Sequence, residues 1–343
     1  TETRVTMAWL SRGTLLRRCA RLAVATGVVG SSAAAFCKSN PDGVTQLRSH
    51  SYPLVEHSHG KARVRVLRVR HHDDKDTVQE YTVATKLFSP LYSKVFTKED
   101  NDRLVATDTQ KNSVYLVAQR SSATTPEGYG IDLASHLLRE YPMLTAVEVV
   151  VQEDLWARVQ APGGSHEHGF VRTAPEKAVA KVRVRREEPD KPIVTSGITG
   201  LTVLKTTQSG FTGYLRDQYT LLPETEERCL ATEMQLEWTY TEGGASDYAA
   251  VRTAVRGSIM QGFFGPPKGG VYSASLQATI YDAGCMVLAA APSVSTISIS
   301  TPNIHMIPFN QLKDLSGAPF NDDVYIATSD PAGTIYCTVA REA

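Results

Sequence analysis

The sequence predicts an α+β fold in which two antiparallel sheets each carry helices on one face. Three observations predict it: alternating apolar and polar residues mark strands, apolar residues at helical spacing mark amphipathic helices, and the same order of elements occurs twice. With 343 residues, of which 42% are hydrophobic and 21% charged, the chain is long and apolar enough to bury two cores.

The first half opens with a predicted β-hairpin. Residues 62–69 alternate branched apolar and polar side chains, a polar turn follows at 72–75, and residues 77–87 form a second strand-like run. This alternation has a period of two, so we expect one face of the hairpin to be polar.

A helix is predicted next, because residues 124–127 supply a cap, a first-turn proline and an acidic residue, and Pro142 ends the pattern. Its apolar face comprises Ile131, Ala134, Leu137, Leu138 and Tyr141. Residues 146–151 then form a predicted strand, and residues 170–185 form another one after a glycine turn.

The second half repeats this order. Helical spacing marks Leu276, Ile280, Ala283, Val287 and Ala290. A shift of 150 residues superimposes Pro142 on Pro292 and Val147 on Ile297. We interpret this as an internal duplication, with a boundary in the charged segment 187–192 and domains at 59–190 and 191–343. Antiparallel sheets have open edges that pair with other subunits, so we expect a homo-oligomer.

Residues 1–58 have the composition of a leader and a linker. No acidic residue occurs between Met7 and Asp42, and four arginines precede the uncharged segment 22–37. This composition suits a mitochondrial presequence, a secretory signal or a membrane anchor that associates the chain with a membrane or an organellar complex. Residues 38–59 are polar and turn-rich and are predicted to be a linker.

The composition also excludes several classes of protein. Thirty-six basic residues balance thirty-six acidic ones, so no general positive field is available to hold nucleic acid. The five cysteines show no C-x-x-C spacing, and we expect reduced, mostly buried thiols. The histidine pairs at 71–72 and at 166 and 168 lack carboxylate or cysteine partners at ligand spacing, so no metal site is predicted.

Seven short strings resemble the urate oxidase (uricase) family, in order and at comparable separations. They are residues 59–61 (HGK), 105–112 (VATDTQKN), 200–205 (GLTVLK), 209–217 (SGFTGYLRD), 222–228 (LPETEER), 275–279 (SLQAT) and 302–305 (PNIH). The likeness covers roughly residues 58–343. It implies tandem tunnelling-fold domains that assemble as a homotetramer around a central tunnel, with active sites between subunits.

The resemblance also implies an activity: oxidation of urate by O2 and water to 5-hydroxyisourate and hydrogen peroxide, without a metal or organic cofactor. Lys61 and Thr107 match the catalytic pair of the family, and His305 matches the residue that joins their proton relay. The matched substrate-binding positions are Asp108, Phe211, Arg228, Leu276, Gln277 and Asn303.

Each substrate-binding role has a physical reason. Arg228 would clamp the anionic purine oxygens with its planar fork, and Gln277 would close the opposite edge. Phe211 would stack on the purine face. Asn303 would hold O2 and then water or peroxide above the ring. Leu276, where the family more often has valine, would contribute backbone contact.

Taken singly, these residues also have purely structural explanations. Lys61 would be a solvated residue that opens a strand, and Asp108 would cap a helix over residues 109–119, a role compatible with substrate binding. Asn303 and His305 would satisfy backbone groups in a turn after Pro302. It is the joint match that favours the functional interpretation.

Two alternatives to an active urate oxidase remain at this stage. One is a uricase-derived structural subunit of a membrane-associated organellar complex. The other is a tunnelling-fold enzyme acting on pterins or related purines, although such enzymes commonly use metal-bound histidines. The sequence ends at residues 341–343 (REA) without a Ser-Lys-Leu address, and together with the leader this favours a mitochondrial location over the peroxisome.

Overall fold

The computed structural model describes residues 37–39, 45–47, 52–72, 75–317, 321 and 323–342. The chain divides into two units, residues 1–54 and 55–343. In the first unit, β1 (Cys37–Ser39) and β2 (Thr45–Leu47) pair antiparallel within the segment predicted to be a linker. The rest of the predicted leader lies outside the described residues. Within the described part, every helix is too short or too polar to cross a membrane.

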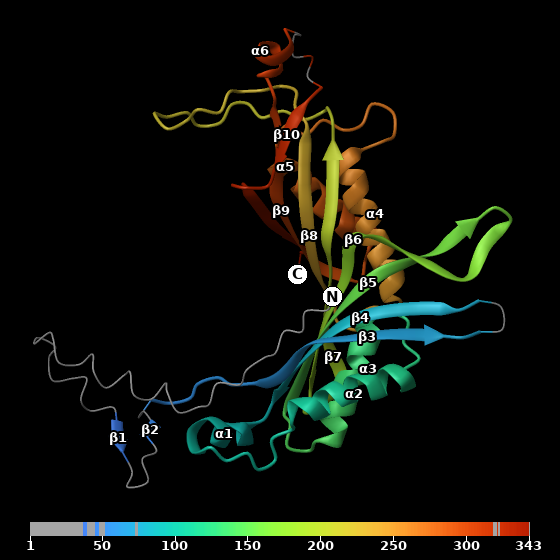
Figure 1. The fold of residues 1–343 in the computed structure, drawn as a ribbon, viewed down its shortest axis with the longest axis vertical. Coiled ribbons are helices and arrows are strands. Elements are labelled where there is room, and N and C mark those ends of the chain that lie inside the picture. The colour runs from blue at the N-terminus through green and yellow to red at the C-terminus, as the bar shows by residue number, and fades with distance from the viewer. Residues whose placement is uncertain are drawn as a thin grey trace, which may run out of the picture. The chain divides into compact units, whose positions relative to one another are not determined.

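The second unit is built on one antiparallel sheet in the order β10-β9-β8-β7-β6-β5-β4-β3, with β11 also paired to β9 (Figure 1). Its strands are β3 (His59–Arg70), β4 (Thr77–Phe88), β5 (Ala146–Ala161), β6 (Gly164–Arg185), β7 (Glu188–Lys205), β8 (Leu230–Tyr240), β9 (Val294–Pro308), β10 (Tyr325–Thr328) and β11 (Thr334–Ala340). The helices are α1 (Ser93–Lys98), α2 (Thr107–Arg120), α3 (Pro126–Glu140), α4 (Tyr248–Phe264), α5 (Leu276–Ala290) and α6 (Leu312–Ser316), with a 3-10 turn at Pro90–Tyr92.

The α+β class with antiparallel strands and packed helices is confirmed, but the two predicted sheets are joined into one. Strands β6 and β7 form a hairpin, with Val182 opposite Val194, so hydrogen bonding continues from one half to the other. The predicted boundary segment 187–192 contains the second of the two turn residues of this hairpin, 186–187, and the first residues of β7. The hydrophobic cores nevertheless change here: one cluster ends at Val194 and the next begins at Ile198. The division into two domains stays a prediction.

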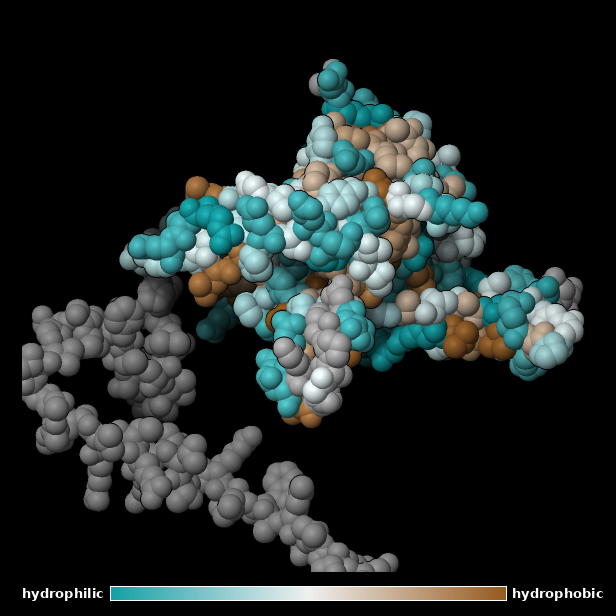
Figure 2. Space-filling model, turned by 90° about the horizontal axis from the view of Figure 1, so that it is seen from above, coloured by the Kyte–Doolittle hydropathy of each residue, from teal (hydrophilic) through white to brown (hydrophobic). Residues whose placement is uncertain are grey.

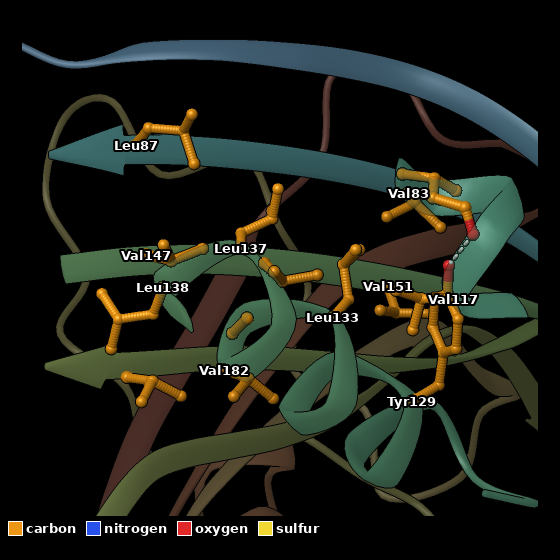
Figure 3. Packing of buried hydrophobic residues seen from close by; sticks show 14 of the residues in the cluster. Val83, Leu87, Val117, Tyr129, Leu133, Leu137, Leu138, Val147, Val151 and Val182 are labelled. Carbon is orange, nitrogen blue, oxygen red and sulfur yellow. Dashed lines mark hydrogen bonds between the residues drawn. The ribbon is translucent and has the colours of Figure 1, made fainter. Parts of the chain in front are cut away.

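The first core forms between α3 and the strands beneath it. Val147, Val149 and Val151 are buried at the period of two that a strand imposes, and Leu133 and Leu137 of α3 are fully buried. Figure 3 shows these leucines directed at the valines of the sheet. Full burial of such a side chain contributes about 1.5–3 kcal/mol, so this layer holds α3 on the sheet.

The duplication is visible in the helices. Helices α3 and α5 have 15 residues each, and both their first and their last residues are offset by 150. Both begin with a hydroxyl cap: Thr125 Oγ1 accepts a hydrogen bond from the Gly128 N–H, and Ser275 Oγ accepts one from the Ala278 N–H, each at 3.2 Å. The repeat predicted from apolar spacing therefore extends to the capping chemistry.

The C-terminal ends of the same two helices carry a matching arginine clasp, which we define as Arg186 and Arg341 with their carbonyl partners. The Arg186 guanidinium donates to the backbone oxygens of Leu138, Tyr141 and Leu144, and the Arg341 guanidinium donates to those of Leu288, Ala291 and Val294. These two sets of carbonyls are also offset by 150 residues. A cation at this position satisfies unpaired carbonyls and interacts favourably with the helix dipole.

A buried polar group links the two halves. Glu127 of α3 is completely buried and accepts hydrogen bonds from Arg252 Nη2 of α4 at 2.8 Å and from Ser196 Oγ of β7 at 2.8 Å. Arg252 Nη1 also lies 3.8 Å from a carboxylate oxygen of Glu153. Burial raises the pKa of Glu153 to about 7, against the opposing effect of Arg252.

Two expectations are wrong in detail. Asp108 does not cap the second helix, because α2 begins one residue earlier, at Thr107, with Ala106 as its N-cap. The predicted burial of the cysteines is also wrong for those whose side chains are described: Cys285 is exposed, and Cys229 and Cys337 are partly exposed, all as free thiols. Cysteine spacing reports on pairing and not on which face of an element the thiol occupies.

Candidate active site

Lys61 is placed by an irregularity in β3. The pairing of β3 with β4 shifts between Lys61 and Val64, and Arg63 adopts a left-handed backbone with φ of 57°. The Lys61 N–H donates to Thr85 Oγ1 at 3.3 Å, and that hydroxyl donates to Gln110 Oε1 of α2 at 2.8 Å. The bulge therefore connects the start of β3 to the first turns of α2.

Thr107 and Asp108 occupy the first turn of α2 beside this bulge. His59 Nε2 lies 3.0 Å from the Val105 carbonyl, which ties β3 to the chain that enters the helix. Lys111, which donates to the Asp108 carboxylate at 2.5 Å, lowers the pKa of Asp108, and the positive charge of Lys61 adds a smaller effect in the same direction. Lys61, Thr107 and Asp108 thus form one group, which we call the first cluster.

The second cluster comprises Phe211, Arg228, Leu276, Gln277, Asn303 and His305. Its base is a set of three hydrogen-bonded loop segments. The Gly210 N–H donates to the Ser273 carbonyl at 2.9 Å, the Phe211 N–H to the Thr225 carbonyl at 2.7 Å, and the Arg228 N–H to the Ser209 carbonyl at 2.8 Å. Because Ser273 lies two residues before the cap of α5, these bonds bring the first turn of α5, with Leu276 and Gln277, to the same place.

A buried lysine that the sequence analysis missed supports this arrangement. Lys205 Nζ, at the end of β7, donates to Ser273 Oγ at 2.6 Å, to the Val271 carbonyl at 2.9 Å and to the Phe263 carbonyl at 3.2 Å. Burial lowers the pKa of Lys205. The sequence did contain a signal for Lys205, because it ends the alternating string 200–205 on the apolar face of the strand. A lysine on such a face needs hydrogen-bond partners.

The Arg228 guanidinium lies next to the Phe211 ring. The Arg228 Cζ lies 5.4 Å from the centroid of the Phe211 ring. This separation places the guanidinium close enough to reach the edge of a planar ligand that stacks on Phe211. Burial lowers the pKa of Arg228.

Asn303 and His305 lie in β9 at the end of the β8–β9 ladder that adjoins Arg228. Asn303 is opposite Thr232 of β8, and its N–H donates to the Gly333 carbonyl at 2.9 Å. His305 is opposite Thr328 of β10. Asn303 also lines a cavity of about 390 Å³ between β9 and residues 327–332. The structure therefore places both residues in a strand and not in a turn.

The second cluster holds buried polar atoms without partners. Five such side-chain atoms occur among the described residues, and three of them are Ser209 Oγ, Arg228 Nε and Asn303 Oδ1. An unsatisfied buried polar atom costs about 1–3 kcal/mol, so the presence of such atoms on Arg228 and Asn303 of the second cluster and on the neighbouring Ser209 indicates a site built for a polar ligand. The ligand must offer both acceptors and donors.

The two clusters do not meet within one chain. Strand β3 forms one edge of the sheet, and five strands, β4 to β8, separate it from β9 (Figure 1). Six steps of about 4.8 Å place β3 and β9 roughly 29 Å apart along the sheet. The expected neighbourhood of His305 with Lys61 and Thr107 is therefore not formed inside a single subunit.

The neighbours of the predicted histidine pairs are defined in part. His71 Nδ1 lies 3.0 Å from Asp76 Oδ1, and the rings of His166 and His168 meet edge to face at 4.6 Å. Throughout the described segments, no group of three or more histidine, cysteine, aspartate or glutamate side chains has an arrangement that could hold a metal ion.

Comparisons with known proteins agree with the fold. A sequence model of the uricase family matches residues 57–183 and 194–336. A uricase of Arabidopsis thaliana is 40% identical over 299 residues, covering 84% of this chain and 96% of the relative. A uricase of Oryctolagus cuniculus is 33% identical over 299 residues, with 87% and 98% covered. The crystal structure of uricase from Arthrobacter globiformis superposes with a TM-score of 0.76 at 32% identity, covering 85% of this chain and 96% of that one.

The match extends over both halves of the sheet and includes every residue of the two clusters. This chain belongs to the uricase family.

Proposed function

We propose that this chain is a urate oxidase that converts urate, O2 and water to 5-hydroxyisourate and hydrogen peroxide. The observation that carries the proposal is the Arg228 guanidinium beside the Phe211 ring, together with the unpartnered buried polar atoms on Ser209, Arg228 and Asn303. A flat, anionic, oxygen-rich purine supplies the aromatic face and the hydrogen-bonding groups that this site lacks.

The second cluster binds the purine. Phe211 supports one face of the ring, and Arg228 donates to purine oxygens from the side, where its positive charge balances the anion. Gln277, exposed in the first turn of α5, supplies an amide donor and acceptor to the opposite edge. Leu276 is buried beneath it. Asn303 holds O2, and later water or peroxide, over the free face of the purine.

The first cluster removes the proton. The Thr107 hydroxyl is a poor base unless its proton passes to a neighbouring amine, and Lys61 supplies that amine. Asp108 contacts the purine edge through its backbone N–H and side chain, and His305 joins the relay. Because Lys61 and His305 lie at opposite ends of one sheet, a second copy of the chain must complete each site, in a homotetramer with intersubunit sites.

No metal or organic cofactor enters this proposal. The positive charge that polarises the bound anion comes from Arg228, and the proton acceptors come from the first cluster. Urate oxidation should therefore continue in the presence of a strong chelator.

The decisive experiment combines two inactive variants. Purified protein is assayed for urate loss, O2 consumption and peroxide release in the presence of a chelator, as wild type, Lys61→Ala and Arg228→Met. Each variant alone should be nearly inactive. When the two are co-expressed and assemble at random, about a quarter of the sites combine an intact Lys61 with an intact Arg228 from different chains, so about a quarter of the activity should return.

Three results would contradict parts of this proposal. A folded, assembled wild-type protein that does not oxidise urate would favour the structural-subunit alternative, which the family comparisons do not favour. Activity that a chelator abolishes would refute the cofactor-free mechanism. Co-expressed variants that stay inactive, each still oligomeric, would show that the sites lie within single chains.

We also propose a mitochondrial, membrane-associated location, supported by the arginine-rich, acid-free composition of residues 7–37. A fluorescent reporter fused after residue 58 should accumulate in mitochondria and remain with the membrane fraction after salt washing. Replacing the four arginines with glutamine should redistribute it. A reporter that stays in the cytosol or reaches peroxisomes would refute this location.

A further inference from the structure

The loop that follows Phe211 turns at Gly213 and reverses direction only at residues 217–220, so that residues 222–225 run back beside it. Gly213 has φ of 72° and lies at a bend between Phe211 and Tyr214. The Gly213 N–H donates to Glu224 Oε1 at 3.1 Å, which attaches the turn to the returning strand of the loop. Only glycine adopts this backbone without strain, so the turn brings the rings of residues 211 and 214 together.

The two rings stack closely. Their centroids lie 4.8 Å apart and their planes differ by 11°. The Tyr214 hydroxyl donates to the Leu222 carbonyl, and Arg216 Nη1 donates to that hydroxyl at 3.3 Å. The Arg216 Cζ also lies 5.8 Å from the Tyr214 centroid. Tyr214 is thus held at its ring by Phe211 and at its hydroxyl by the loop.

These contacts form a series of flat groups, namely Arg228, Phe211, Tyr214 and Arg216, in which each contacts the next. A phenyl ring has two faces, and Tyr214 occupies one of those of Phe211. A ligand that stacks on Phe211 must therefore use the other face. The loop that carries this series projects from the sheet (yellow in Figure 1), and the surface of this projecting part, seen from above, is hydrophilic with separate hydrophobic residues (Figure 2).

We propose that Tyr214 is a positioning residue for the purine: its ring fixes the plane of Phe211 and keeps the opposite face open for stacking. The inference rests on the proposed urate oxidase function and extends it to a residue outside the two clusters. Phe211 is only half-buried, so without Tyr214 its ring gains rotational freedom that purine binding must remove again.

The role predicts which kinetic constant changes. An aromatic pair of this geometry stabilises by an amount that corresponds to a factor of about three to ten in a binding constant. Tyr214 touches neither the proton acceptors nor the O2 position, so its loss should raise KM for urate by about three- to tenfold and leave kcat within about twofold.

The test uses three variants of the full-length protein. Tyr214→Leu removes the ring, Tyr214→Phe keeps the ring and removes the hydroxyl contact, and Tyr219→Leu is a matched control in the same loop, at a side chain that is 80% exposed. Steady-state urate oxidation is measured together with the Kd of xanthine, a planar purine that lacks the oxygen at C8. Tyr214→Leu should weaken both constants by the same factor, whereas Tyr214→Phe and Tyr219→Leu should stay within about twofold of wild type.

The outcomes separate this inference from the proposed function. Wild-type protein that does not oxidise urate would overturn the proposed function and this inference with it. Wild-type protein that oxidises urate, together with a Tyr214→Leu variant whose KM and xanthine Kd are unchanged, would overturn only the role of Tyr214. An equal loss in Tyr214→Phe and Tyr214→Leu would assign the effect to the hydroxyl and the loop and would also refute the stacking role.

Discussion

Removing the arginine clasp at the end of one half should destabilise the fold without touching either site cluster. In Arg341→Ala, the carbonyls of Leu288, Ala291 and Val294 lose their common donor. The Nε–Val294 and Nη2–Ala291 distances are 2.8 and 3.0 Å, within the normal range for strong hydrogen bonds. The same argument applies to Arg186→Ala in the first half.

The magnitude follows from the number and exposure of the bonds. Hydrogen bonds that involve a charged group contribute about 1.5–3 kcal/mol each when desolvated, and a cation at a helix C-terminus adds about 0.3–1 kcal/mol. Arg341 is exposed, so in the alanine variant water can replace part of the lost hydrogen bonding to the three carbonyls. We expect each alanine variant to lose about 1–3 kcal/mol, which lowers the thermal midpoint by about 2–8 °C in a unit of this size. The two losses should add, because the clasps share no partners.

Thermal or urea unfolding at fixed protein concentration checks this expectation, since oligomerisation makes the midpoint depend on concentration. The matched control is Arg103→Ala, whose side chain is 67% exposed and lies 3.8 Å from Asp102, and it should change stability by less than about 0.5 kcal/mol. Arg341→Lys keeps the positive charge but loses the planar guanidinium, so its free energy of unfolding should lie between those of wild type and Arg341→Ala. If Arg341→Ala and Arg103→Ala both unfold at the midpoint of wild type, the arginine clasp contributes nothing to stability and the reasoning is refuted.

Three further predictions concern the core and the link between the halves. Leu133→Ala should lower the free energy of unfolding, measured in urea, by about 2–5 kcal/mol because it opens a cavity under α3. The control Leu315→Ala, at a residue 74% exposed, should lower it by less than about 0.5 kcal/mol. Equal losses in the two variants would contradict the packing argument. Arg252→Met should cost about 3–5 kcal/mol in the same measurement because the Glu127 carboxylate stays buried without its cation, and an unchanged midpoint would show that the pair is dispensable. The pKa of Glu153 is raised from 4.5 to about 7, so between these pH values the folded state retains a proton that the unfolded chain releases. The contribution of this group to the free energy of unfolding is therefore full below about pH 4.5. It falls by up to about 3 kcal/mol as the pH rises to 7. Glu153→Gln should therefore gain stability relative to wild type between pH 5 and pH 8, and a difference that does not change with pH would refute the buried-acid interpretation.

Local patterns were sufficient to predict the first hairpin, α3, α5 and the repeat between the halves. Alternation with a period of two and capping by hydroxyl residues act over a few residues, so they can be read from the chain directly. The same holds for the strings of the resemblance, which named every residue of both clusters. Helix α4 was not located. The join between β6 and β7 was also missed, because residues 187–192 have the composition of a charged linker, whereas pairing with the preceding strand makes them part of a hairpin.

The sequence analysis named candidate site residues but could not give their arrangement in space. The order of strands places Lys61 roughly 29 Å along the sheet from His305, and a sequence carries no direct record of that separation. The sequence analysis also assigned no role to Lys205 or Tyr214. Each acts through a contact that the sequence does not reveal: Lys205 binds Ser273, and Tyr214 stacks on Phe211.

The sequence by itself determined the fold class, the duplication and the chemical types available to a site, because these depend on side-chain periodicity and identity. Only the tertiary structure decided that the halves share one sheet, that Arg186 and Arg341 close equivalent helices, and that buried polar atoms of Ser209, Arg228 and Asn303 have no partners. Those features arise from hydrogen bonds and packing between residues distant in the chain, and such contacts exist only once the sheet has brought them together.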